Sequence, residues 1–382
     1  MDNEFDDIRP YEDHELAAVY EELLSDEAFC RVLSAVFPGV PLEAVAQKMR
    51  ACHTKTEFQR AFCYPFLTDI MSRCTDGVTL DYDALRGDGR AFTYISNHRD
   101  IVLDSGFLSR LLLDLGLDTV EIAIGDNLLI YPWIKKLVRV NKSFIVLRGL
   151  SMRQMLEAST RMSRYMHYAI RHKHQSIWIA QREGRAKDSN DLTQDSLLKM
   201  MAMGGEGQPL DRLKELNLVP LSLSYEYDPC DYLKAEELQR RRDDPAFHKT
   251  EADDLLNMKT GIFGRKGRVH FCVAPCLNNE LDSLDPDMPR SELFKQISAL
   301  IDRHIHANYR IYAGNYVAHD LLTGTHEFAD RYSAAEQATF ESYLAERLNL
   351  ITLPGKDEDF LRERLLAMYA NPLTNHLNAI RQ

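Results

Sequence analysis

A histidine flanked by carboxylates stands where a predicted strand gives way to a predicted helix. His98 follows the apolar run 92–96, Asp100 is two residues further on, and Asp104 comes about one helical turn after that. In an α/β sheet the carboxyl end of a strand is the usual place for a site. A histidine there, with one ring nitrogen held by a carboxylate, suits general-base chemistry. An isolated His–Asp pair is more often structural, so the rest of the chain decides between these interpretations.

Three later segments carry charged residues, a glycine or a proline within or just after an apolar run. These positions are Arg148 after 143–147, Glu183, Gly184, Arg185 and Lys187 after 177–180, and Pro220 inside 218–223. Guanidinium and ammonium groups match phosphate, so the three cations are candidates for binding an anionic substrate. The alternative is ordinary surface charge. For Glu183 it is an ion pair with Arg182 or Arg185.

Alternating strands and helices are predicted to position these residues. The expected strands are 92–96, 119–124, 143–147, 176–180, 218–225 and 268–274, with helices at 103–115, 128–139, 152–171 and 210–216. This order is typical of an α/β domain with a mostly parallel sheet and flanking helices. We expect a helical N-terminal region over 1–88, the α/β domain over 89–290 and a helical C-terminal region over 291–382. The charged insertion 227–267 is expected to form a solvated helix and loop.

Composition narrows the function further. The chain has 382 residues, 45% hydrophobic and 27% charged, with a net charge of -12, which argues against non-specific nucleic-acid binding. Seven cysteines without C-x-x-C spacing favour reduced thiols in a cytoplasmic protein. The acidic N-terminus does not resemble a signal peptide, and we expect no spanning segment.

Together the four segments resemble, in order and spacing, the four blocks of the glycerolipid acyltransferase superfamily, which includes glycerol-3-phosphate and lysophosphatidate acyltransferases. Asn97-His98 matches the start of the N-H-x-x-x-x-D block, and the run ending at Arg148 matches the second block. Glu183-Gly184-Arg185 is similar to E-G-x-R, and Val219-Pro220-Leu221 to the fourth block. The resemblance covers about residues 90–280.

Two departures from the family pattern bear on the site. His98 and Asp104 are separated by one residue more than the family motif has, so Asp100 is an alternative partner, although Asp104 is favoured. Arg185 follows Gly184 directly, without the intervening residue of E-G-x-R, so Lys187 is expected to share the role of the arginine.

The resemblance implies a reaction without a cofactor. His98 would act as a base on an acceptor hydroxyl, which attacks an acyl thioester, and Asp104 would hold the imidazole. The turn at Gly184 would offer N–H groups to the oxyanion. Asn97, Arg148, Glu183, Gly184, Arg185, Lys187 and Pro220 are the expected substrate-binding residues. The expected donor is acyl-CoA or acyl-carrier protein, and no metal is expected.

The acceptor and the location stay open at this stage. Glycerol-3-phosphate or a lysophospholipid is the first choice, and the alternative is an N-acyl amino acid lipid with a free hydroxyl. The segment 128–139 joins apolar and aromatic residues to Lys135, Lys136 and Arg139, which is typical either of a bilayer interface or of a half-buried helix. A peripheral location on the inner face of the membrane is therefore an alternative to a freely soluble one.

Other classes of protein fit less well. His98-Arg99-Asp100 matches the H-R-D of protein kinases, but Ser105 stands where that pattern needs asparagine. His172 and His174 do not form a metal site with nearby carboxylates. A non-catalytic lipid-binding protein is the main alternative from a different class, and it would not need both His98 and its carboxylate.

Overall fold

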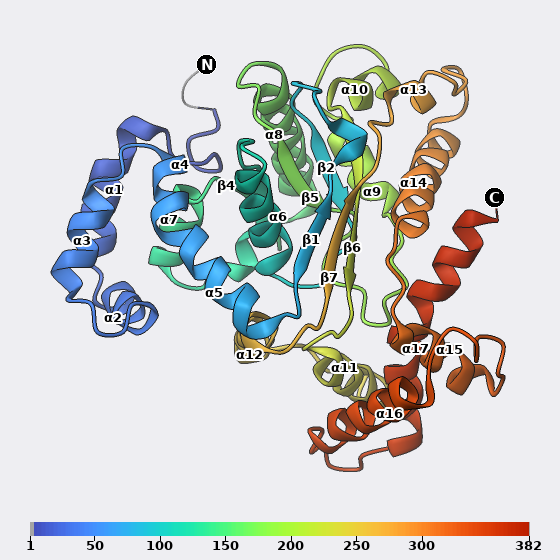
Figure 1. The fold of residues 1–382 in the computed structure, drawn as a ribbon. Helices are drawn as coiled ribbons and strands as arrows, with labels where there is room; N and C mark the ends of the chain where they lie inside the picture. Colours follow the sequence, from blue (N-terminus) through green and yellow to red (C-terminus); the bar gives the residue numbers. More distant parts are fainter. Residues whose placement is uncertain (1–3, 382) are drawn as a thin grey trace.

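The centre of the molecule is a seven-stranded sheet, seen in a computed structural model that describes residues 4–381. The strands lie in the order β1-β7-β6-β2-β5-β3-β4 (Figure 1). Their bounds are β1 Val78–Asp81, β2 Thr93–Ser96, β3 Glu121–Gly125, β4 Ser143–Val146, β5 Ile177–Ala180, β6 Leu218–Tyr225 and β7 Val269–Val273. Every neighbouring pair is parallel except β6 and β7. The structure confirms the predicted α/β class with a mostly parallel sheet.

Apolar residues on both faces of the strands explain why helices cover the sheet on two sides. In β2, Tyr94 belongs to one core and Ile95 to the other, and in β5 Trp178 and Ile179 divide in the same way. Successive side chains of a strand point to opposite faces. Burying each such side chain contributes about 1.5–3 kcal/mol. A strand that is apolar on both faces therefore requires a helical layer on each.

The two helical layers differ in size. One core is closed by α5 Tyr64–Cys74 and α6 Leu103–Asp114. The other is closed by α8 Met152–Arg171, α9 Asp195–Met201, α10 Pro209–Glu215, α13 Asn278–Leu281 and α14 Arg290–Ala307. The helix α6 directly follows β2, so the loop between them lies at the carboxyl end of a central strand.

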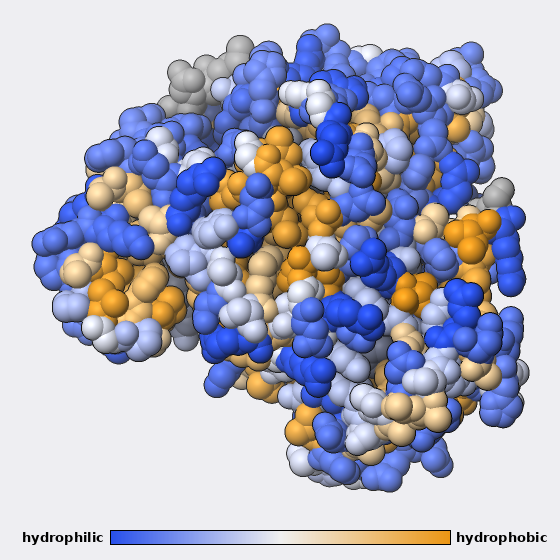
Figure 2. All heavy atoms as spheres, in the orientation of Figure 1, coloured by the Kyte–Doolittle hydropathy of each residue, from blue (hydrophilic) through white to orange (hydrophobic). Residues whose placement is uncertain are grey.

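The N-terminal helices form a lobe with an apolar core of its own. They are η1 Asp13–Glu15, α1 Leu16–Leu24, α2 Glu27–Val36, α3 Leu42–Arg50, α4 Lys55–Phe58 and the π turn η2 Gln59–Cys63. The lobe packs against α7 Pro132–Val140 through Trp133 and Val140. Figure 2 shows apolar side chains at the α2 end of this lobe, where Val32 and Val36 are exposed.

Two predicted elements differ from the structure here. The helix expected over 128–139 is divided into η4 Asp126–Leu128 and α7, because Pro132 begins α7 and Tyr131 before it is extended. The stretch up to residue 88, expected to be helical, also contains β1 and η3 Asp83–Leu85. β1 has only four residues, too few for its alternation to stand out in the sequence.

The remaining helices gather at the carboxyl side of β6. Those of the insertion are α11 Asp231–Asp243 and α12 Glu251–Phe263, and those after α14 are α15 Ala313–Thr323, α16 Ala334–Asn349 and α17 Glu358–Ile380. The insertion was expected to be solvated, but α11 buries Asp231 completely and packs on α17. The reason is pairing: Asp231 bonds Arg347 at 2.6 Å and accepts from Tyr343 at 2.6 Å. None of the helices within residues 4–381 is long and apolar enough to cross a bilayer.

Candidate active site

Asn97 fixes the start of the loop that follows β2. Its amide Nδ2 donates to the carbonyl of Leu223 at 2.9 Å, and its Oδ1 accepts from the Leu223 N–H at 2.8 Å. The side chain therefore continues the pairing of β2 with β6 for one residue beyond the strand. Asn97 is fully buried, so the substrate-binding role predicted for it becomes a role in holding the loop.

His98 and Asp104 form a hydrogen-bonded pair. His98 Nδ1 lies 2.8 Å from Asp104 Oδ2, which also accepts from the N–H groups of Arg99 at 2.7 Å and Asp100 at 3.0 Å. Asp104 sits in the first turn of α6 and is fully buried, whereas the His98 side chain is 13% exposed. With Nδ1 donating to the carboxylate, the neutral ring leaves Nε2 as an acceptor.

Asp100 binds the backbone at the start of α6, unlike Asp104, which binds His98. Its Oδ1 accepts from the N–H groups of Val102 at 2.9 Å and Leu103 at 2.8 Å, which caps the entry to α6. Burial raises the pKa of Asp100, and the negative charge of Asp104 adds to the shift. Between the two carboxylates the structure places Asp104 beside His98. The extra residue relative to the family motif is taken up in the turn at 101–102.

Trp178 supports the imidazole from the neighbouring strand, and sequence reasoning missed it. Its ring meets that of His98 edge to face, with centroids 5.7 Å apart. The indole Nε1 donates to Ser96 Oγ at 3.0 Å, which holds the ring in place. Only the pairing of β2 with β5, with Tyr94 opposite Trp178, brings these residues together.

Arg148 and Glu183 meet at the surface of the same edge of the sheet. They form an ion pair in which the Arg148 side chain is 33% exposed and the Glu183 side chain 69%. The backbone N–H of Arg148 donates to Asp126 Oδ1 at 3.0 Å, which ties the loops after β3 and β4 together. Gly184 has φ +67°, a backbone conformation that suits glycine, so it turns the chain immediately after Glu183.

Arg185 and Lys187 point away from Arg148, toward the helices of the insertion. Arg185 is 8% exposed and donates to Asn257 Oδ1 of α12 at 2.9 Å. Lys187 Nζ lies 2.7 Å from Glu237 Oε2 of α11. Burial lowers the pKa of Lys187 to about 8, and Glu237 opposes the shift. The three cations predicted to converge on a phosphate thus have three separate protein partners.

Pro220 lies within the sheet. It stands opposite Ile95 of β2, and its carbonyl accepts from the Ala274 N–H at 2.9 Å. Since Pro220 is buried inside β6, its place is structural: it belongs to the strand that also carries Leu223, the anchor of Asn97.

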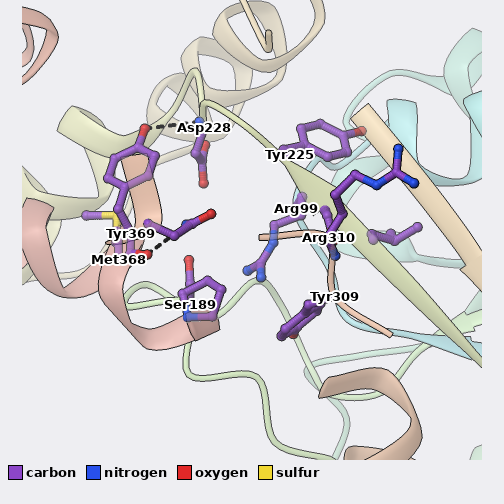
Figure 3. Close-up of a pocket in the computed structure, with 12 residues that line it drawn as sticks. Arg99, Ser189, Tyr225, Asp228, Tyr309, Arg310, Met368 and Tyr369 are labelled. Carbon is purple, nitrogen blue, oxygen red and sulfur yellow. Dashed lines mark hydrogen bonds between the residues drawn. The ribbon is translucent and has the colours of Figure 1, made fainter. Parts of the chain in front are cut away.

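A small cavity lies beside Arg99, the residue after His98 (Figure 3). Arg99 pairs with Asp191 at 2.6 Å, and Asp191 also accepts from the Tyr309 hydroxyl at 2.8 Å. The volume is about 30 Å³, room for about one water molecule and too little for a lipid substrate. This network could not be predicted from the sequence, because its members come from three distant segments.

Apolar side chains are exposed near the loops that follow β3 and β4. Tyr131 is 49% exposed, and the first turns of α8 expose Met152, Met155 and Leu156 at helical spacing. These segments leave adjacent parallel strands at their carboxyl ends, so they lie on the side of the sheet that carries His98. The predicted segment 128–139 is therefore partly a packed helix and partly an exposed apolar rim.

Comparisons with known proteins give a distant structural likeness. No family model matches the chain, and no curated protein matches it. Among solved structures, the chain is similar to the crystal structure of the 1-acyl-sn-glycerophosphate acyltransferase PlsC from Thermotoga maritima. The identity is 12%, the match covers 77% of this chain and 94% of that one, and the TM-score is 0.35. A likeness at this identity and TM-score assigns no function, so a function has to be inferred from the residues of the site.

Proposed function

We propose that this protein is an acyltransferase that moves a fatty acyl group from a thioester to a hydroxyl, with His98 as the general base. The observation that carries the proposal is the buried Asp104 carboxylate, 2.8 Å from Nδ1 of a partly exposed histidine at the carboxyl end of β2. A carboxylate held by two backbone N–H groups and an imidazole is fixed in position. That is what an orienting group needs.

The reaction follows from these atoms. Nε2 of His98 takes the proton of the acceptor hydroxyl as its oxygen attacks the thioester carbonyl carbon. Asp104 stabilises the imidazolium that forms, and the tetrahedral intermediate expels the thiolate, which receives the proton from His98. This acid–base function is worth about 10²–10⁴-fold in rate. The turn at Gly184 is the proposed source of N–H groups for the oxyanion.

For the substrates we propose acyl-CoA or acyl-carrier protein as donor and glycerol-3-phosphate or a lysophospholipid as acceptor. Arg148 is the cation best placed for the acceptor phosphate, because it is exposed and its partner Glu183 is more exposed still. A phosphate would displace Glu183 and gain a charge-assisted, bidentate contact. Arg185 and Lys187, bound to Asn257 and Glu237, are assigned a supporting role in the loop.

Arg185 and Lys187 are already bound to protein partners, which also favours a second candidate acceptor. If the acceptor has no phosphate, no set of free cations is needed, and a hydroxylated N-acyl amino acid lipid fits the same base. We propose in either case that the enzyme meets a bilayer through the apolar rim of Tyr131, Met152, Met155 and Leu156. Such a contact would bring lipid to the side of the sheet where His98 lies.

One assay tests the proposal and separates the acceptors. Purified protein is incubated with acyl-CoA or acyl-carrier protein and each acceptor in turn, and free thiol release and product mass are measured. Thiol release that depends on an acceptor and on His98 supports the proposal. Lipid binding without any thiol release would instead support a non-catalytic lipid-binding protein.

A further inference from the structure

Tyr225 reaches the dyad from the strand that anchors the loop after β2. It is the last residue of β6, two positions after Leu223, whose backbone binds Asn97. Alternate residues of β6 share one face, so Leu221, Leu223 and Tyr225 all lie in the core that α6 closes. Asp104 lies in the first turn of α6. The end of β6 and the start of α6 therefore bring Tyr225 and Asp104 together.

The Tyr225 hydroxyl is surrounded by negative charge. Its pKa is raised well above the ordinary value by burial and then by the charges of Asp104 and Asp100. A phenol that keeps its proton beside a carboxylate acts as a donor. Figure 3 shows the ring bordering the cavity, with the hydroxyl on the side away from Arg99.

Two buried polar atoms where β6 ends and α6 begins lack a partner in the described part of the chain. Within residues 4–381, neither the Tyr225 hydroxyl nor Asp104 Oδ1 makes a hydrogen bond of ordinary geometry. The other oxygen of Asp104, Oδ2, is occupied by His98 Nδ1 and two N–H groups. Buried polar atoms are almost always paired, so two unpaired atoms on neighbouring elements, one a donor and one an acceptor, point to each other.

We propose that Tyr225 is a positioning residue whose hydroxyl donates to Asp104 Oδ1, so that both oxygens of the carboxylate are held and His98 is oriented. A carboxylate fixed at both oxygens cannot turn about its own bond. The O–H dipole also disperses part of the negative charge of Asp104. Without this hydrogen bond, Asp104 would attract the His98 imidazolium more strongly. The carboxylate could then turn, and the imidazole would be oriented less well. The kinetic consequence rests on the proposed function, whereas the contact itself does not.

The test measures the pKa of His98 rather than turnover. Histidines labelled with ¹³C at Cε1 are titrated by NMR, and the His98 signal among the 13 histidines is assigned with His98→Ala. We expect Tyr225→Phe to raise the pKa of His98 by a few tenths to about one unit, because a positive dipole end is removed from Asp104. A pKa that is unchanged or lower would overturn the proposal.

The chain offers a matched control. Tyr20 in α1 is 1% exposed, and its hydroxyl is also buried without a partner among residues 4–381. Tyr20→Phe therefore deletes the same group in the N-terminal lobe, and it should leave the pKa of His98 unchanged. If Tyr225→Phe does not fold, 3-fluorotyrosine at position 225 keeps the hydroxyl and makes it a stronger donor. The pKa of His98 should then fall, and an unchanged value would again contradict the proposal.

Kinetics separate this proposal from the proposed function. If the protein is the acyltransferase, Tyr225→Phe should lower kcat by about 3- to 30-fold and move the acidic limb of the pH–rate profile upward with the pKa of His98. If no acyl transfer occurs but the NMR shift does, the proposed function fails and the contact stands. If transfer depends on His98 but Tyr225→Phe behaves like Tyr20→Phe, the role of Tyr225 alone fails.

Discussion

Two loops at the carboxyl edge of the sheet carry most of the predicted site, and they are built differently. In the loop after β2, the two carboxylates and their partners are close in sequence: His98 and Asp104 are six positions apart, and Asp100 caps the backbone of Leu103. By contrast, the side chains of Asn97 and Arg99, at the start of this loop, have partners far along the chain. In the loop after β5, the partners come from far along the chain. Arg185 bonds Asn257, 72 positions away, and Thr193 bonds Asp302, 109 positions away.

This difference explains where sequence reasoning succeeds. A dyad inside one strand–loop–helix unit depends on local geometry, which spacing predicts. The direction of Arg185 depends on α12, whose place follows from tertiary packing. We therefore propose a catalytic role for the loop after β2, whereas the residues of the loop after β5 divide between the surface and anchors. The predictions below test that division.

The largest effect is expected for His98→Ala. Removing the imidazole removes the base, so kcat should fall at least about 10²-fold and up to about 10⁴-fold. His98 is only partly buried and its side-chain hydrogen bond is to Asp104, so the variant should fold. The measurement is steady-state thiol release together with circular dichroism. A folded variant with near wild-type kcat would remove the dyad from the mechanism.

The two carboxylates give the next comparison. Asp104→Asn should lower kcat by roughly 10–10²-fold, because a neutral amide no longer stabilises the imidazolium. Asp100→Asn should leave kcat within a few-fold of wild type, since an amide oxygen can still cap Leu103. Both are measured at saturating substrate. An equal loss of kcat in the two variants would mean that Asp104 has no greater effect on His98 than Asp100 has.

Arg148, in the loop after β4, and Arg185, in the loop after β5, test the division between surface residues and anchors. Arg148→Ala should raise the acceptor KM about ten- to a hundred-fold for a phosphorylated acceptor, with an unchanged thioester KM. Arg148→Lys should recover part of the loss, since a point charge replaces a fork.

Arg185→Ala should instead destabilise the protein by about 1–3 kcal/mol, because Asn257 loses its buried donor. Urea unfolding of both variants is the control. A stable Arg185→Ala protein with a raised acceptor KM would restore the predicted phosphate contact at Arg185.

Particular elements and residues show how much of the fold and of the site can be predicted from the sequence. The strand 218–225 and the helix 152–171 were predicted with the bounds that the structure has, because their apolar patterns are long. β1 was missed because it is short and pairs only with β7. His98 could be placed by its strand, but Trp178, Tyr225 and Asn257 reach the site region through sheet order and helix packing. No local sequence pattern encodes the order of the strands or the packing of the helices.

The smallest effect concerns the anchor of the second loop. Asp302 of α14 accepts from the N–H and the hydroxyl of Thr193, at 2.8 and 2.6 Å. Burial raises the pKa of Asp302 to about 6, and the charges of Asp191 and Asp195 add to the shift, against the hydrogen bonds from Thr193.

A carboxyl whose pKa is raised on folding contributes stability that is complete below its unfolded pKa of about 3.9 and is lost as pH rises through about 6. Between about pH 4.5 and 6.5, that loss amounts to roughly 2 kcal/mol. Asp302→Asn keeps an acceptor for Thr193 but cannot ionise, so it should lack this loss. The difference in unfolding free energy between the variant and the wild type should therefore rise over this range, whatever other groups titrate. Urea unfolding at several pH values measures it. A difference that stays flat with pH would show that Asp302 is already ionised in the folded protein, and that the loop after β5 is anchored by a charge rather than by a neutral acid.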